Sequence, residues 1–171
     1  TEMPELILPW FDVAIVGEVE NSITDICNGK YADKIGLIIN DNGTIINTGP
    51  AQRIESKELD NLPMPSWHLF PYKKYRYYPM VGVDPVATIQ ASRGCPYGCG
   101  YCPYTKNQGR PWRARSAKSI ADEIEYFYNL MCITDFHVSD LDPTVSDERT
   151  REIALELIAR RLPITWKIYS I

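Results

Sequence analysis

The sequence predicts an α/β protein whose C-terminal half contains a parallel β-sheet. From Ala87 onward, strand-like runs and amphipathic helical runs alternate in the order strand, helix, strand, helix, strand. Such an order gives a parallel sheet with right-handed crossovers. A cysteine-rich loop follows the first of these strands, at the strand end where parallel sheets gather their reactive groups. Both observations place the chemistry of this chain after residue 87.

The N-terminal part predicts a strand, a helix and a hairpin. Residues 11–18, "FDVAIVGE", form a continuous apolar run, as expected of a strand covered on both faces. Residues 18–29 show helical spacing of apolar side chains, and Gly29 is placed to cap that helix. Residues 34–49 predict a β-hairpin, because the turn at residues 41–43, Asp-Asn-Gly, tolerates positive φ.

Residues 59–85 predict an irregular segment packed along a domain surface. Five prolines exclude a long helix and a central strand, and six aromatic residues argue against a floppy linker. The aromatics, with Lys73, Lys74 and Arg76, also allow stacking on single-stranded nucleic acid. Simple packing with solvated lysines is the interpretation that we prefer.

The C-terminal elements are the most regular. We expect strands at residues 86–92, 133–140 and 164–170, with helices at 116–132 and 146–161 between them. Ser116 and Ser146 are candidate N-caps. The buried face of the first helix is predicted to carry Ile120, Ile124, Phe127 and Met131.

Three of the five cysteines, Cys95, Cys99 and Cys102, fall within eight residues. An odd count with such clustering argues against a disulfide framework and favours a reducing cytoplasm. Thiolates select zinc, copper(I) or iron–sulfur. Structural zinc takes four ligands, whereas three thiolates on a [4Fe–4S] cluster leave one iron open for a substrate or cofactor. Glycines at 94, 98 and 100 are expected to let the loop turn all three sulfurs inward.

Two other interpretations of these cysteines remain. One is a zinc site completed by a distant ligand, His137 or His68, and the other is a set of reduced structural thiols. Cys27 and Cys132 lie in apolar helical patterns, so we expect them in the core.

The segment Cys95-Pro-Tyr-Gly-Cys99-Gly-Tyr101-Cys102 resembles the radical S-adenosylmethionine (SAM) superfamily. The resemblance implies that the three cysteines hold a [4Fe–4S] cluster whose open iron chelates the amino and carboxylate groups of SAM. It also implies that one electron cleaves SAM to methionine and a 5'-deoxyadenosyl radical. Tyr101, and with it Gly100, would then lie near SAM.

Residues 93–104, 112–127 and 136–166 resemble the cobalamin-dependent branch of that superfamily. That branch commonly has a paired-Asp segment after the second strand, and Ser139-Asp140 stands in its place here. The resemblance implies SAM contacts at this strand end, from Asp140 with Ser139. Asp142 is an alternative, and both aspartates are also suited to starting the next turn.

Residues 12–26 and the hairpin resemble the end of a cobalamin-binding Rossmann-like domain. The resemblance puts Gly17 and Glu18 near the cobalamin tail, although a D-x-H-x-x-G motif is missing, so this chain alone is expected to bind cobalamin poorly. The fold class expected is therefore the end of a Rossmann-like domain followed by the first half of a partial (β/α) radical SAM barrel. The predicted domains are 1–49, a connector at 50–86, and 87–171.

The net charge and the two ends of the chain say little about function. The net charge of −4 favours neither a nucleic-acid nor a membrane partner, and no apolar run approaches a membrane span. Three arginines at 110, 113 and 115 suit an anionic ligand or an acidic electron donor of the flavodoxin or ferredoxin type, or else a solvated loop. The chain starts without Met and stops in a strand-like run, so we expect a piece of a longer protein rather than one with trimmed ends.

The function predicted is that of a radical SAM enzyme core with cobalamin-dependent methyl transfer to, or rearrangement or cyclisation of, an unactivated carbon of a small-molecule substrate. The rival is a non-enzymatic iron–sulfur electron carrier or a zinc-stabilised module. The 171 residues alone are expected to be an incomplete catalyst that aggregates, because the last strand would have an unpaired edge.

Overall fold

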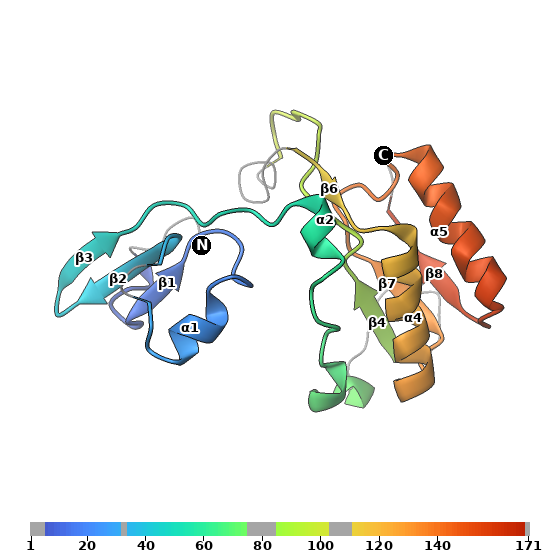
Figure 1. Cartoon of the computed structure of the whole chain (residues 1–171), viewed down its shortest axis with the longest axis horizontal. Helices are drawn as coiled ribbons and strands as arrows, with labels where there is room; N and C mark the ends of the chain where they lie inside the picture. The colour runs from blue at the N-terminus through green and yellow to red at the C-terminus, as the bar shows by residue number, and fades with distance from the viewer. Residues whose placement is uncertain (1–5, 32–33, 75–84, 103–110, 170–171) are drawn as a thin grey trace. The chain divides into compact units, whose positions relative to one another are not determined.

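The computed structural model describes residues 6–31, 34–74, 85–102 and 111–169. The chain divides into two compact units, residues 1–54 and 55–171 (Figure 1). The division into domains at 1–49, 50–86 and 87–171 stays a prediction.

Unit 1 is built on a small antiparallel sheet in the order β1-β2-β3. Its strands are β1 (Val13–Ile15), β2 (Leu37–Asp41) and β3 (Thr44–Asn47), and the five-residue helix α1 (Ile23–Cys27) lies between the first two. The prediction of a strand covered on both faces is wrong for residues 11–18, since only Ala14 of β1 is buried and Phe11 is 60% exposed. A three-residue strand with an antiparallel partner needs cover on one face only.

The predicted hairpin is confirmed. Asp41 pairs with Thr44, and the two residues between them have positive φ, 50° at Asn42 and 93° at Gly43. This is the type I′ turn, which matches the twist of the flanking strands. Gly29 also has positive φ, 70°, directly after Asn28, the residue that caps α1.

The proline-rich segment is irregular, as predicted, over its described part. The helix α2 (Ser56–Leu59) ends where this segment begins. The segment contains two 3₁₀ turns, η2 (Trp67–Leu69) and η3 (Tyr72–Lys74), and residues 75–84, with Arg76, lie outside the described ranges. Trp67 and Tyr72 pack against the core of unit 2, which fixes the segment.

The parallel sheet of unit 2 confirms the predicted alternation of strands and helices. Its order is β4 (Val86–Ile89), β7 (Asp135–Val138) and β8 (Thr165–Lys167). The two crossovers contain α4 (Ala117–Met131) and α5 (Asp147–Arg160), which pack against each other over one face of the sheet (Figure 1). In register, Thr88 lies beside His137, and His137 beside Lys167.

The core of unit 2 lies between this sheet and the two helices. All four residues predicted for the buried face of α4 are buried, and they pack with Phe136 and Val138 of β7. Both predicted caps are confirmed: the Ser116 hydroxyl accepts from the Ser119 N–H and the Ser146 hydroxyl from the Arg149 N–H, at 3.1 and 3.3 Å.

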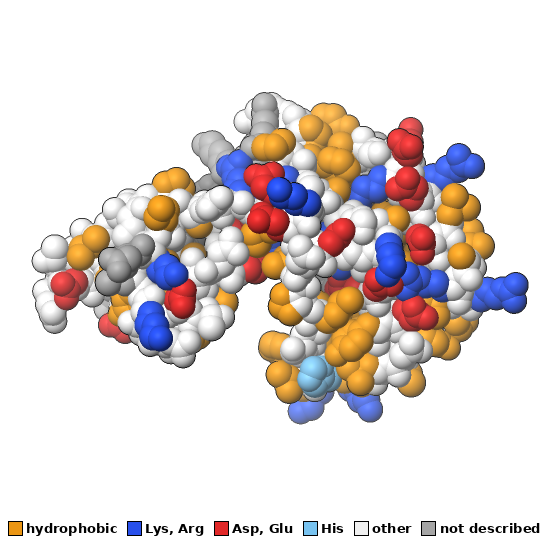
Figure 2. Space-filling model, viewed as in Figure 1, with side chains coloured by type: hydrophobic (Ala, Val, Ile, Leu, Met, Phe, Trp, Pro, Cys, Tyr) orange, Lys and Arg blue, Asp and Glu red, His pale blue; other side chains and the backbone are white. Residues whose placement is uncertain are grey.

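The surface contradicts one prediction about the cysteines. Cys27 and Cys132 are exposed, not in the core, because Cys27 ends a helix with no buried residue and Cys132 has left α4 in a left-handed conformation, at φ 55°. On the face of unit 2 shown in Figure 2, acidic and basic side chains lie interspersed. Among the described residues, every helix is too short or too polar to cross a membrane.

Candidate functional site

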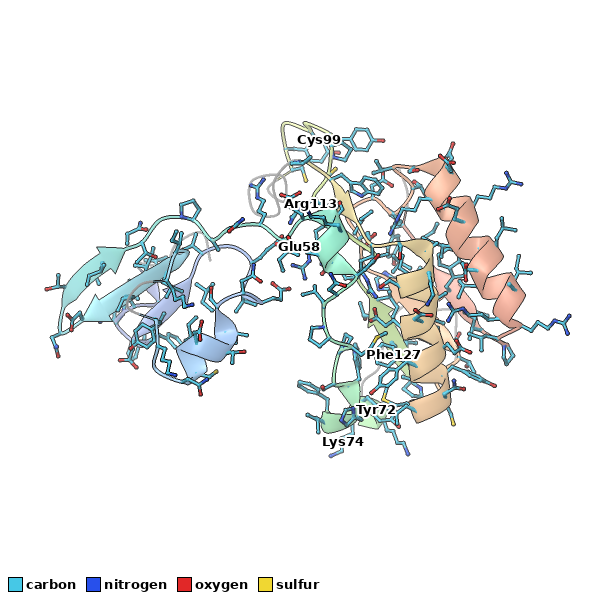
Figure 3. The ribbon with its side chains drawn as sticks, in the orientation of Figure 1. Glu58, Tyr72, Lys74, Cys99, Arg113 and Phe127 are labelled. Atoms are coloured by element: carbon cyan, nitrogen blue, oxygen red, sulfur yellow. The ribbon has the colours of Figure 1, made fainter. Side chains whose placement is uncertain are left out.

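The cysteine loop leaves the sheet of unit 2 at the carboxyl end of β4. After β4 the chain forms β5 (Ser92–Arg93), which pairs with β6 (Arg113–Ala114) before the helix α4 begins. Gly94 follows with φ 81°, a conformation that favours glycine. Figure 3 shows Cys99 on the loop that extends beyond Arg113 of β6.

The three clustered cysteines form no disulfide and lie in different surroundings. Cys95 is buried, Cys102 is half-buried and Cys99 is exposed, and the Cys102 N–H donates to the Cys99 carbonyl at 3.1 Å in a tight turn. Over the described ranges, no three His, Cys, Asp or Glu side chains converge as a metal site, so the sulfurs are not turned inward together as the sequence suggested. The donor chemistry fits an iron–sulfur cluster, since three cysteines outside any disulfide lie within eight residues of one loop.

Neither histidine supports the zinc interpretation. His137 is buried within β7, where its ring meets Tyr169 edge-on at 5.5 Å between centroids, and His68 is exposed on η2. Neither of these described side chains joins the cysteines in a metal-ligating group.

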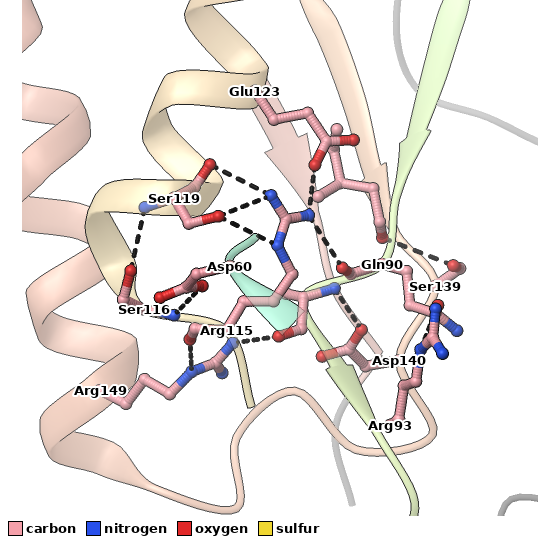
Figure 4. Close-up of polar contacts among 12 residues, drawn as sticks. Asp60, Gln90, Arg93, Arg115, Ser116, Ser119, Glu123, Ser139, Asp140 and Arg149 are labelled. Atoms are coloured by element: carbon pink, nitrogen blue, oxygen red, sulfur yellow. Dashed lines mark hydrogen bonds and ion pairs between the residues drawn. The ribbon is translucent and has the colours of Figure 1, made fainter. Parts of the chain in front are cut away.

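Asp140 follows β7 and reaches the junction between β4 and β5 (Figure 4). Its Oδ1 accepts from the Ala91 N–H at 2.7 Å, and its Oδ2 accepts from the Ser92 hydroxyl at 2.5 Å. Burial raises the pKa of Asp140, while these hydrogen bonds and the Arg149 charge oppose the rise. Ser139 is exposed, and its N–H donates to the Ile89 carbonyl at 2.9 Å.

Asp142 starts a turn, which is one of the two roles that the sequence analysis allowed for it. The carboxylate is buried, and its Oδ1 accepts from the Thr144 N–H at 2.9 Å and the Thr144 hydroxyl at 2.8 Å. Because this aspartate closes its own turn, it is a structural residue of the connection into α5.

Two arginines predicted for a solvated loop or a partner surface are internal. Arg113 is only 2% exposed, and Arg115 forms an ion pair with Glu123 and donates to the Ser119 hydroxyl. Burial raises the pKa of Glu123, and Arg115 opposes that rise. Arg110 lies outside the described residues. The solvated-loop prediction is therefore wrong for Arg113 and Arg115.

Arg149 is a site residue that the sequence analysis missed. It is buried in the first turn of α5, donates to the Ala91 carbonyl at 2.6 Å and to the Arg115 carbonyl at 3.0 Å, and stacks on the Trp112 ring at 5.5 Å. The sequence did contain a signal for this role. Arg149 follows two acids in the first turn of a helix, where a cation is unfavourable unless other groups compensate its charge.

Four further residues were predicted to contact SAM or cobalamin. Tyr101 is 90% exposed, and open space surrounds the position that a Cβ would take at Gly100. In unit 1, Gly17 has φ 109° and faces Ala51, while the Glu18 carboxylate accepts from the Ile54 N–H at 2.7 Å. Both residues thus take part in local packing, and their contact with cobalamin stays a prediction.

The parallel sheet with a three-cysteine loop at its carboxyl edge defines a radical SAM domain. Residues 89–168 match the radical SAM superfamily, and this part of the chain belongs to that superfamily of enzymes. The chain is 33% identical, over 94% of its length, to an anaerobic magnesium-protoporphyrin IX monomethyl ester cyclase of Cereibacter sphaeroides. It is also 28% identical, over 99% of its length, to an uncharacterized methyltransferase of Pyrococcus horikoshii. It spans 27% and 38% of those two proteins.

Two solved structures share the fold. The cobalamin-dependent SAM radical enzyme OxsB, with aqua-cobalamin and SAM bound, matches 95% of this chain with a TM-score of 0.70 and 19% identity. The radical SAM methyltransferase TsrM from Kitasatospora setae, with tryptophan substrate and a SAM analogue bound, matches 93% with a TM-score of 0.62 and 22% identity. The chain covers 24% and 31% of those proteins.

Proposed function

We propose that this chain carries the iron–sulfur and SAM-binding part of a cobalamin-type radical SAM enzyme. The observation that carries the proposal is the placement of three cysteines outside any disulfide, Cys95, Cys99 and Cys102, on one loop at the carboxyl edge of the parallel sheet. Active sites of parallel α/β folds lie at that edge. The loop also falls within the segment that matches the superfamily.

In this proposal each part of the loop has its own task. The three thiols would be the ligands of a [4Fe–4S] cluster, with one iron left without a protein ligand. When bound, that cluster supplies the electron that cleaves SAM. Tyr101 and Gly100 directly precede Cys102, which puts an aromatic face and an unobstructed backbone beside the ligands. The buried Cys95 anchors the loop at its start.

The reaction class rests on the similar proteins. A cyclase and methyltransferases are among them, and OxsB contains cobalamin. We therefore propose methyl transfer, rearrangement or cyclisation on a small-molecule substrate, in a cytoplasmic protein with a flavodoxin- or ferredoxin-type electron donor. Cobalamin would be held in the intact protein, and Gly17 and Glu18 are the candidate contacts that this chain would contribute.

Anaerobic reconstitution of the intact protein tests this proposal. We expect about four irons per chain, as a cubane cluster requires, and formation of 5'-deoxyadenosine from SAM with a strong reductant. Cys95→Ala, Cys99→Ala and Cys102→Ala should each abolish iron uptake. Cys27→Ala and Cys132→Ala are matched controls, because both thiols are exposed and lie outside the loop, and both variants should keep the iron.

Two results would contradict the proposal. Tight zinc binding without iron uptake would indicate a zinc-stabilised module. A complete iron–sulfur cluster whose spectrum is unchanged by SAM would indicate an electron carrier.

A further inference from the structure

Ala91 connects β4 to β5, and charged residues hold both polar groups of its backbone. Its N–H donates to Asp140 Oδ1 at 2.7 Å. Its carbonyl accepts from Arg149 Nη2 at 2.6 Å and from the Arg115 N–H at 3.0 Å. Ala91 itself is 2% exposed, so these bonds form away from bulk water, where hydrogen bonds to charged groups are strongest.

Asp140 holds the next residue as well. Its second oxygen accepts from the Ser92 hydroxyl at 2.5 Å, and Ser92 is also 2% exposed. One carboxylate therefore fixes two consecutive residues, and the first cluster cysteine, Cys95, lies three positions further along the chain.

Arg149 ties this junction to two other segments. Its Nε donates to the Arg115 carbonyl at 3.0 Å, and the Arg115 side chain forms an ion pair with Glu123 of α4. Figure 4 shows these groups arranged around the junction, from the loop after β7, the start of α5 and α4. The origin of the cysteine loop is thus fixed by residues 24 to 58 positions away in sequence from the backbone groups that they hold.

We propose that Asp140 and Arg149 are positioning residues, which hold Ala91 and Ser92 so that the cysteine loop starts from a fixed point. This inference rests on the proposed function of the three cysteines. It reassigns Asp140, because both of its carboxylate oxygens are directed at donors of the chain rather than at a ligand. Partners behind the metal ligands of other proteins act in this way, by orienting the segment that bears the ligands.

Asp140→Ala and Asp140→Asn in the intact protein separate positioning from SAM binding. The asparagine keeps an acceptor for the Ala91 N–H and gives the Ser92 hydroxyl a donor in place of an acceptor, so both hydrogen bonds can persist without the charge. Without SAM present, we expect Asp140→Ala to weaken iron binding about tenfold, as loss of an outer partner does at metal sites. Asp140→Asn should restore most of it. Hydrogen exchange should accelerate over residues 88–102 in the alanine variant only.

Asp135 provides a matched control. It is the first residue of β7, at the end of the strand opposite to the one that Asp140 follows, and its two oxygens accept from two hydroxyls, those of Thr165 at 2.5 Å and Thr134 at 3.0 Å. Asp135→Ala should lower thermal stability while iron binding and exchange over residues 88–102 stay at the wild-type level.

The outcomes are distinguishable. Wild-type iron binding and exchange in Asp140→Ala, with weaker SAM binding in both Asp140 variants, would overturn the inference and make Asp140 a SAM ligand. If the wild-type protein takes up no iron, the proposed function fails, and the exchange pattern alone decides the positioning role. If Asp140→Ala does not fold, Ser92→Ala replaces it: faster exchange confined to residues 88–102 supports the inference, and unchanged exchange overturns it.

Discussion

Trp67 of the proline-rich segment meets Phe127 of α4 edge-on, with ring centroids 6.2 Å apart and ring planes at 70°. Edge-to-face contact is a favoured geometry for aromatic pairs because the positive ring edge faces the negative ring face. Phe127 is fully buried, so this contact joins an irregular segment to the core of unit 2. The irregular, proline-rich segment is thus held against the core by a side-chain contact.

Trp67→Ala should therefore destabilise the protein. We expect a loss of about 2 kcal/mol in the free energy of unfolding, below the range for a fully buried aromatic because Trp67 is half-buried. Leu69→Ala is the control, since Leu69 lies two residues away and is 75% exposed, and its effect should stay within about 0.5 kcal/mol. Urea denaturation measures both, and equal effects of the two substitutions would contradict the packing role.

Gly36 and Gly43 offer a second comparison, because both have φ near +90° but different surroundings. A Cβ at Gly36 would lie 2.4 Å from Ala51 Cβ and 2.6 Å from Ala51 Cα, whereas nothing lies within 4 Å at Gly43. Gly43→Ala should cost about 1 kcal/mol of stability from backbone strain alone. Gly36→Ala should cost at least about 3 kcal/mol, since part of the clash is with backbone.

A double variant checks the cause of that larger cost. Ala51→Gly removes the nearest atom, so Gly36→Ala combined with Ala51→Gly should recover part of the loss. No recovery in the double variant would mean that backbone strain at Gly36 or contact with the backbone of residue 51, rather than with the Ala51 Cβ, sets the cost.

The elements of unit 2 could be predicted because their signals are local. Helical periodicity and the capping serines at 116 and 146 act within a single turn, so a short window of sequence contains all the information. The hairpin at residues 37–47 was predictable for the same reason, since Asn42-Gly43 specifies the turn.

The buried hydrogen bonds and ion pairs of unit 2 could not be predicted from short windows of sequence. Arg115 pairs with Glu123, which is close in sequence, but Arg149 and Asp140 meet Ala91 across 58 and 49 residues. Which arginine is solvated and which is internal depends on these distant carbonyl and carboxylate groups. The antiparallel pairing of β1 likewise depends on where β2 returns, which the apolar run at residues 11–18 does not contain.

Arg160 near the end of α5 is predicted to stabilise the packing of α5 on α4. Its guanidinium lies 2.7 Å from Asp122 and 2.6 Å from Glu125, and only 15% of the side chain is exposed. Glu156 lies 3.6 Å from the same guanidinium. Arg160→Ala should cost about 1 kcal/mol, because a shielded network of three carboxylates contributes more than a single surface pair. Lys118→Ala is the control. Lys118 also forms an ion pair with Asp122, but its side chain is 74% exposed, so this ion pair should contribute less to stability.

Salt separates the charge effect of Arg160 from its packing. Raising the ionic strength to about 1 M shortens the screening length to about 3 Å, so the difference in stability between wild type and Arg160→Ala should shrink. A difference that is independent of salt would mean that the aliphatic part of Arg160 accounts for the effect.

The buried His137 should make stability depend on pH. Burial lowers its pKa from the ordinary value of 6.5, and the nearby Lys167 charge lowers it further. The unfolded chain then binds a proton more readily than the folded one, so this contribution to stability is complete above pH 6.5 and declines as pH falls below it. Below pH 6.5 the free energy of unfolding should fall by at most about 1.4 kcal/mol per pH unit because of this histidine.

Urea midpoints between about pH 8 and pH 5, which bracket the titration of an ordinary histidine, measure this effect. His137→Gln should flatten the profile below pH 6.5. Asp140 and Glu123, whose pKa values are raised by burial, titrate in both the wild type and the His137 variant, so the difference between the two profiles isolates His137. If the wild type and His137→Gln show parallel profiles, protonation of His137 does not lower the stability of the folded protein, which would contradict this prediction.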